Sequence, residues 1–240
     1  MKRTMTLVLA LALATISNAQ WGKNIRGNGD VVTQQRTVGE YRAVSLAGWF
    51  DVELVPGREG TITIQGDSNL LDHIITQVDN GNLELKTEKG YNLSSSHRTG
   101  IKITVPVESI QAVNLSGSGD ISGSDPIKAP AFSTRLAGSG DIDLNLEADQ
   151  VETSVSGSGD VTLSGSTGEL NISVSGSGDV MAFGLKAKIA KVNVTGSADV
   201  EVTATEQLMA WISGSGDIAY RGDPQKVEAK SVGSGSVTKE

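Results

Sequence analysis

The chain has 240 residues, of which 28 are Asp or Glu and 20 are Lys or Arg, so its formal net charge at pH 7 is −8. This acidic balance argues against nucleic acid and anionic lipid as partners, because both carry negative charge. Cysteine is absent, which excludes disulfides, thiolate metal sites, thiol catalysis and an anchor through a lipid-modified N-terminal cysteine.

Residues 1–19 have the pattern of a secretory signal peptide. Lys2 and Arg3 give a charged start, residues 7–14 form a short apolar run, and small residues precede Gln20. This order is typical of a cleaved leader, and the run is too short to span a bilayer. We therefore expect an exported protein without a membrane span, located in the periplasm, on the cell surface or in the medium.

Residues 20–110 are predicted to be an irregular β half that continues into the following repeats or caps them. Alternating apolar residues predict strands over residues 61–64, 82–86 and 101–105. The letters DNGN at residues 79–82 are a strong turn signal. Residues 90–100 are polar and Ser-rich, which predicts a surface loop. Residues 27–31 and 47–52 resemble degenerate copies of the repeat that follows.

Residues 111–240 contain a regular repeat centred on the letters GSGD. The octapeptide SVSGSGDV occurs at residues 154–161 and again at residues 173–180, and the aligned aspartates lie 19 to 21 residues apart, or 18 in one case, with Ser236 in the seventh copy. A fixed period near 20 is typical of a solenoid. We interpret the first glycine and the aspartate of each copy as a structural turn ladder. Its members are Gly117, Asp120, Gly138, Asp141, Gly157, Asp160, Gly176, Asp179, Gly196, Asp199, Gly214 and Asp217.

Apolar residues alternate on both sides of each GSGD, which predicts strands with one buried face. Stacked copies would align three apolar columns, the core of an all-β parallel β-helix with about 20 residues per coil. Residues 164–168 and 221–224 are rich in glycine, serine or charge and are predicted to form the second corner of their coils. The columns are Leu115, Leu136, Val155, Val174, Val194 and Ile212; then Ile121, Ile142, Val161, Val180, Val200 and Ile218; then Leu144, Leu163, Ala182, Val202 and Tyr220.

The chain resembles the putative auto-transporter adhesin, head GIN domain family. The resemblance rests on GNGDVV, VSLAGWFDVELVPG, TITIQGDSNLLDHI, GNLELKT, serial GSGD, YRGDP and a terminal GSGSV, in that order over residues 27–237. It implies a single-stranded right-handed β-helix, whereas the word adhesin is a family label that implies no ligand. The chain departs from the repeat at Ala198, where a glycine is expected, and at residues 49–50, where Trp-Phe replaces Ser-Gly.

The aspartate column could serve the turns or bind calcium. The calcium-binding β-roll has a glycine-aspartate turn on both sides of each coil, whereas this repeat has one GSGD corner per coil. Calcium also takes six to eight oxygen ligands, more than one aspartate per coil readily supplies. Stacked carboxylates must then be exposed or accept hydrogen bonds from backbone N–H groups or serine hydroxyls, and aspartate and serine often cap their own turn. We favour turns and expect no metal and no cofactor.

The two glycines of the repeat are not equivalent in the sequence. The first is glycine in every copy, whereas Ala198 replaces the second once. The first glycine is therefore predicted to need a left-handed φ or to lie where a neighbouring coil leaves no room for Cβ. The second is predicted to tolerate a methyl group.

Other chemistries are less well supported. No helix or GK[ST] motif follows the glycines, which argues against a phosphate site. Short coils and few aromatic residues argue against a polysaccharide-cleaving cleft, and His73 and His97 lie in the irregular half. Residues 221–223 spell Arg-Gly-Asp, an adhesive tripeptide that also suits a turn. We predict a non-enzymatic surface-presenting protein with no assigned ligand-binding residue, whose partner could be a surface glycan, a protein or a second copy. A polysaccharide hydrolase or lyase and a calcium-stabilised module remain the alternatives.

Overall fold

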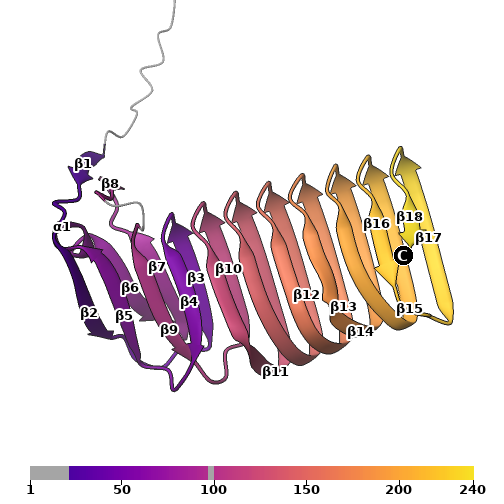
Figure 1. Ribbon diagram of the computed structural model, residues 1–240, viewed down its shortest axis with the longest axis horizontal. Coiled ribbons are helices and arrows are strands. Elements are labelled where there is room, and N and C mark those ends of the chain that lie inside the picture. Colours follow the sequence, from indigo (N-terminus) through magenta and orange to yellow (C-terminus); the bar gives the residue numbers. More distant parts are fainter. Residues whose placement is uncertain (1–21, 97–99) are drawn as a thin grey trace, which may run out of the picture.

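The structure is a computed structural model that describes residues 22–96 and 100–240. The predicted signal peptide lies outside the described residues. The chain forms the predicted single-stranded parallel β-helix, with about seven turns and roughly 19 residues per coil. Figure 1 shows the coils stacked along the long axis, with the indigo strands of the N-terminal region at one end and the yellow C-terminal strands at the other.

Each regular coil is built around one long strand that runs from one GSGD corner to the next. Equivalent residues of successive coils lie opposite each other in parallel strands, as Val155 and Val174 do. The strands are β10 (Ala112–Gly117), β11 (Ile121–Gly138), β12 (Ile142–Gly157), β13 (Val161–Gly176), β14 (Val180–Gly196), β15 (Val200–Gly214), β16 (Ile218–Arg221), β17 (Lys226–Gly233) and β18 (Val237–Lys239).

The second corner differs from the prediction. Residues 164–168 bend the chain without ending the strand, because pairing between β12 and β13 continues from Asn145 opposite Ser164 to Ala148 opposite Thr167. Gly165, with φ of +109°, supplies a backbone conformation that other residues rarely adopt. Residues 221–224 behave differently: β16 ends at Arg221, and the pairing resumes only with β17.

Two of the three predicted apolar columns run through the regular coils without interruption. The columns that begin at Leu115 and Ile121 are buried along their length and stay in register. The third column is interrupted, because the register between β13 and β14 shifts after Thr162, and its last member, Tyr220, is only partly buried. Removing these aliphatic side chains from water is the main force that holds the coils together.

The N-terminal region adds two less regular coils and an antiparallel end. β3 pairs in parallel with β10 and β7, and β4 pairs in parallel with β11 and β9, so the sheet continues past the repeats. Beyond them, β2 and β9 each pair antiparallel with β5, and β6 pairs antiparallel with β7. The elements are β1 (Lys23–Arg26), β2 (Val31–Thr37), β3 (Ala43–Gly48), β4 (Asp51–Pro56), β5 (Thr61–Asp67), α1 (Ser68–Leu71), β6 (Ile74–Asp79), β7 (Asn82–Thr87), β8 (Tyr91–Ser94) and β9 (Lys102–Val107).

The three strands predicted in this region are present, as β5, β7 and β9. The DNGN turn joins β6 to β7, with positive φ values at Asn80 and Gly81 that fit a type I′ hairpin. Residues 47–52 form a true corner, because Gly48 lies opposite Gly117.

One local prediction for this region was wrong, and a second was wrong over residues 91–94. Residues 27–31 lead from β1 into β2, and β1 pairs with β8 rather than with a coil, so they form no copy of the corner. The predicted loop over residues 90–100 contains β8.

Specific side-chain contacts close the N-terminal end. Leu70 and Leu71 of α1 are fully buried. The Arg36 guanidinium donates hydrogen bonds to the carbonyl oxygens of Leu71, at 2.6 Å, and Ile74, at 2.7 Å. These bonds satisfy carbonyl groups at the point where the chain leaves α1 for β6.

A buried carboxylate ties three segments of this end together. Asp67 is 1% exposed and accepts hydrogen bonds from the Gly29 amide at 2.8 Å and from the Ser95 hydroxyl and Ser96 amide, each at 3.0 Å. The Ser96 hydroxyl donates a further bond. Burial alone would raise the pKa of Asp67, but the bonds from Ser96, Gly29 and Ser95 outweigh it and hold the pKa well below its usual range.

Candidate functional site

The residues of the predicted turn ladder lie in one column and are linked from coil to coil. Oδ1 of each aspartate accepts a hydrogen bond from the main-chain N–H at the same position one coil later. This differs from the predicted capping of the aspartate's own turn. The bonds run to Asp120 from Asp141 (3.0 Å), to Asp141 from Asp160 (2.9 Å), to Asp160 from Asp179 (2.9 Å), to Asp179 from Asp199 (2.8 Å), to Asp199 from Asp217 (2.8 Å) and to Asp217 from Ser236 (2.7 Å).

The two ends of the aspartate column differ electrostatically. At Asp51, one coil before Asp120, partial desolvation and the charge of Asp120 raise the pKa. At Asp217 the hydroxyl and amide of Ser236 both donate to the carboxylate and lower the pKa. Ser236, in the seventh copy of the repeat, therefore donates two hydrogen bonds to Asp217 and adds no negative charge to the column.

The glycines of the corner are crowded by the main chain of the preceding coil. The first glycine of every copy has a φ between +130° and +159°, as the sequence predicted. A Cβ on Gly176 would lie 2.4 Å from the Gly157 carbonyl oxygen. A Cβ on Gly178 would lie 2.1 Å from the Gly159 oxygen, so the second site is equally tight and differs mainly in φ.

Ala198 shows how one copy accommodates a methyl group at the second site. The amide at this site donates to the first glycine's carbonyl one coil earlier in Gly119, Gly140, Gly159, Gly178 and Gly235. Among the described corners, Ala198 and the following Gly216 do not make this bond, whereas the serine amides beside them, at Ser197 and Ser215, keep theirs. The methyl group is thus admitted at the expense of one backbone contact in each of two coils.

The corner geometry suits a structural turn. Each Oδ1 is committed to a backbone amide, and within residues 22–96 and 100–240 no three His, Cys, Asp or Glu side chains gather closely enough to hold a metal ion. Each regular corner leads into a strand rather than a helix, so the helix N-terminus that usually completes a phosphate cradle is not part of it.

The Arg-Gly-Asp tripeptide is engaged within the chain. Arg221 forms an ion pair with Glu240 at 3.0 Å and stacks over the ring of Phe183, 3.9 Å from its centroid. Asp223 accepts a 2.6 Å bond from Lys239, and this contact lowers the pKa of Asp223. Both charged side chains therefore help to fasten the last coil.

Glu59 and His73 of the irregular half are also bound to neighbours. Glu59 accepts hydrogen bonds from the amides of Glu108 and Ser109, each at 2.8 Å. His73 lies 2.8 Å from a Glu88 oxygen and stacks on Tyr91. His97 lies outside the described residues. These contacts give each group a structural role.

A second feature, which the sequence analysis did not assign, is the outer face of the long sheet just before the corners. We call it the polar face. It consists of two outward columns in register across β3 and β10 to β15. The first column is Ser45, Asn114, Arg135, Ser154, Ser173, Asn193 and Trp211; the second is Ala47, Ser116, Ala137, Ser156, Ser175, Thr195 and Ser213.

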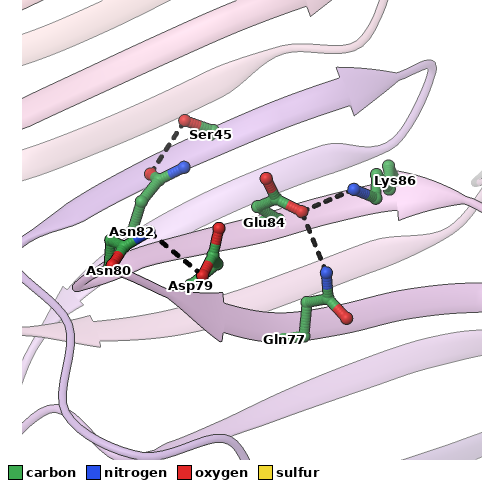
Figure 2. Close-up of polar contacts among 7 residues, drawn as sticks. All are labelled: Ser45, Gln77, Asp79, Asn80, Asn82, Glu84 and Lys86. Carbon is green, nitrogen blue, oxygen red and sulfur yellow. Dashed lines mark hydrogen bonds and ion pairs between the residues drawn. The ribbon is translucent and has the colours of Figure 1, made fainter.

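Hydrogen bonds extend the polar face onto the N-terminal coils. Asn114 donates to the Ser45 hydroxyl at 3.1 Å, and Ser45 donates to Asn82 at 2.8 Å. Figure 2 shows the second of these contacts and the neighbouring Glu84, which accepts bonds from Lys86 and Gln77. The polar character of this face thus continues onto β7 and β6.

A shallow groove of about 430 Å³ crosses the polar face. Arg135 lies at one side and Asn193 and Thr195 at the other, with serines between them. Trp211 follows next to Asn193 in the adjacent strand and is 40% exposed. A guanidinium, a row of hydroxyls, an amide and an aromatic ring therefore lie in line across successive strands.

Fold and surface together define a class: single-stranded β-helical proteins with repetitive outer faces. A family profile described as "Putative auto-transporter adhesin, head GIN domain" matches residues 40–224, and the chain belongs to this family. No curated protein matches the chain. Within the described residues, no helix is long and apolar enough to cross a membrane.

Solved structures share the fold over nearly the whole chain. A putative adhesin from Bacteroides fragilis has a TM-score of 0.83 at 22% identity, covering 90% of this chain and 100% of that one. A putative lipid binding protein from Parabacteroides distasonis has a TM-score of 0.76 at 27% identity, covering 91% and 100%. A putative adhesin from Parabacteroides merdae has a TM-score of 0.71 at 24% identity, covering 91% and 99%.

Proposed function

We propose that this chain is an exported, non-enzymatic adhesin-like protein that binds an extended glycan along its polar face. Export is supported by the signal-peptide pattern of residues 1–19 and by membership of an adhesin family. The protein then acts in the periplasm, at the cell surface or in the medium by presenting a rigid surface.

The observation that carries this proposal is the register of the two outward columns. Equivalent side chains of neighbouring parallel strands lie about 4.8 Å apart, so Ser154, Ser173 and Asn193 offer hydrogen-bonding groups at regular intervals along the helix axis. A linear polymer that crosses the strands meets the same chemistry at each step. Binding can then add up over several coils although each contact is weak.

The groups in the groove fit a polyhydroxyl chain. Serine hydroxyls and the Asn193 amide both donate and accept hydrogen bonds, which matches sugar hydroxyls. The exposed Trp211 ring beside Asn193 provides an aromatic surface on which the apolar side of a sugar ring can stack. Arg135 adds one positive charge, which favours a glycan that carries occasional carboxylates.

Affinity electrophoresis tests this proposal. The protein is run through gels containing laminarin, dextran or alginate, with the variants Trp211→Ala and Ser173→Lys. We expect one polysaccharide to retard the protein and both variants to weaken retardation about tenfold or more, because one removes the ring and the other fills the groove.

Thr162→Lys is the matched control, because it adds the same charge to the same strand, β13, on the far side of the GSGD corner. It should be retarded like the unsubstituted protein. Equal weakening by the Ser173 and Thr162 variants would contradict a site on the polar face. Reducing ends released from the retarding polysaccharide would contradict the non-enzymatic role, and binding to phosphatidylcholine vesicles instead of glycans would favour lipid.

A further inference from the structure

We infer that the C-terminal coil is a docking edge for a second copy of the chain, which adds its own β17 in antiparallel orientation and makes a two-fold, end-to-end dimer. The proposal does not depend on the glycan function, because it concerns the end of the helix and not its polar face. The strand that carries it is β17, whose eight residues Lys226–Gly233 are all exposed.

One edge of β17 is free. Among the described residues, β17 pairs with β15 alone, from Gln207 opposite Lys226 to Gly214 opposite Gly233. The Ser234 amide donates to the Gly214 carbonyl at 3.0 Å, so the even-numbered residues just before it direct their backbone groups toward β15. Backbone groups alternate in direction along a strand, so Val227, Ala229 and Ser231 direct their N–H and C=O groups to the free edge. Such an edge is a template for another strand.

The same three residues leave the end of the core uncovered. Val227, Ala229 and Ser231 lie opposite Leu208, Ala210 and Ile212, which are buried, yet Val227 is 43% exposed. The other end of the helix is closed by α1 and by Arg36. Among the described residues, β2 and β6 at the other end also pair with one strand each, but the core there is covered by α1. Joining two C-terminal ends is therefore the arrangement that covers the core-facing residues of β17 in both copies. A two-fold arrangement satisfies both copies at once and stops at a dimer.

Charge and strand overlap together select one register for this pairing. A centre at Val227 would also place Lys226 opposite Glu228, but it would pair only residues 226–228 of β17, whereas a centre at Ala229 pairs residues 226–232. Lys226, Glu228 and Lys230 alternate along the strand on the side opposite the core. Antiparallel pairing centred on Ala229 places Glu228 opposite Lys230 of the second copy, and this pair occurs twice. It also places Val227 opposite Ser231 and Ala229 opposite itself, so that core-facing residues meet core-facing residues.

Neighbouring registers are unfavourable. Moving the centre by one residue, to Glu228 or to Lys230, places that charge opposite its own copy. Like charges directly opposite each other destabilise a strand pair, and opposite charges stabilise it. The intrachain contact between Lys226 and Glu228, at 2.6 Å, adds a second cation beside each carboxylate.

The test is a charge swap followed by sedimentation velocity at low salt, with protein expressed from the full sequence. The unsubstituted protein should sediment as a dimer at micromolar concentration. Glu228→Lys alone and Lys230→Glu alone should each weaken dimerisation about tenfold or more, because each places like charges opposite one another. The double variant Glu228→Lys/Lys230→Glu should dimerise again, and an equimolar mixture of the two single variants should form a heterodimer.

Two further variants separate association from folding. Ala229→Pro removes an N–H that faces the free edge, so it should block dimerisation while the monomer keeps its circular dichroism and melting temperature. Glu147→Lys, an equal charge reversal at an exposed site in the middle of the helix, should leave the dimer intact. A monomer at high concentration, or a dimer that ignores both single reversals and Ala229→Pro, would overturn the inference.

Discussion

The N-terminal region and the regular coils are stabilised in opposite ways. The N-terminal end depends on contacts that occur once, such as the Arg36 bonds to two carbonyls and the bonds from Gly29, Ser95 and Ser96 to Asp67. The regular coils repeat the same contacts at every step, from the apolar columns to the aspartate–amide bonds. A single change should therefore be most damaging at the end, and in the coils its cost should depend on how far the backbone must move.

Asp67→Ala should have the largest effect of the changes considered. It removes the buried carboxylate that accepts from the Gly29 and Ser96 amides and releases the segments that these bonds hold. We expect a loss of about 4 kcal/mol in the free energy of unfolding, measured by urea denaturation. Asp223→Ala, which removes an exposed carboxylate at the other end, is the control and should leave the urea midpoint almost unchanged. Similar losses from both would remove the distinction between the regions.

The paired glycines of one corner give the next largest effect. Gly176→Ala combines a φ of +142° with a close approach to the Gly157 carbonyl, so we expect a loss of about 3 kcal/mol. Gly178→Ala meets the Gly159 carbonyl but has an ordinary φ, and the corner at Ala198 shows how the clash can be relieved. We expect about 1–2 kcal/mol there. A larger penalty at Gly178, by the same urea titration, would mean that crowding and not φ dominates.

Acid should weaken the N-terminal end through Asp67. The pKa of this carboxyl is lowered in the folded protein, so its stabilising contribution is complete above the unfolded value near 4. It is then lost as pH falls below that value toward the folded pKa. Melting temperatures measured from pH 6 to pH 3 should fall more steeply for the unsubstituted protein than for Asp67→Asn. Parallel curves would show that other carboxylates account for the acid sensitivity.

Asp179→Asn should have the smallest effect. The amide oxygen can still accept the bond from the Asp199 N–H, and the change removes a negative charge between Asp160 and Asp199. We expect a change within about 0.5 kcal/mol, neutral or stabilising. Asp179→Ala, which removes the acceptor, should cost about 1 kcal/mol. A large loss from the asparagine variant would mean that the charge itself is required.

The regular coils were predictable because their contacts repeat with the sequence. Leu115 and Leu136 occupy the same position of successive copies, so aligning the letters also aligns the side chains in space. The same parity could have revealed the polar face, since Ser154, Ser173 and Asn193 alternate with the buried columns. Trp211 was missed because the sequence analysis followed only the buried positions. Its place beside Asn193 is found only when the outward residues are aligned across strands.

The N-terminal region was less predictable because its partners lie far apart in the sequence. Asp67 accepts hydrogen bonds from Gly29 and Ser96, which lie 38 and 29 residues away in the sequence. Local sequence patterns do not predict contacts over such separations. Residues 27–31, GNGDV, resemble the repeat, but β1 pairs with β8 and not with a coil, so the motif forms no corner. A corner therefore needs both the repeat sequence and an adjacent coil with a corner at the same position.

The aspartate–amide bonds also give the helix a direction of assembly. Each carboxylate, from Asp120 to Asp217, accepts a hydrogen bond from an amide about 20 residues later in the chain. Every completed coil therefore presents the acceptor to which the next coil binds. A chain that crosses a membrane N-terminus first would meet these acceptors in the right order, with its closed end already formed. Winding could then keep pace with translocation, and each newly added turn would hinder backward slippage of the chain.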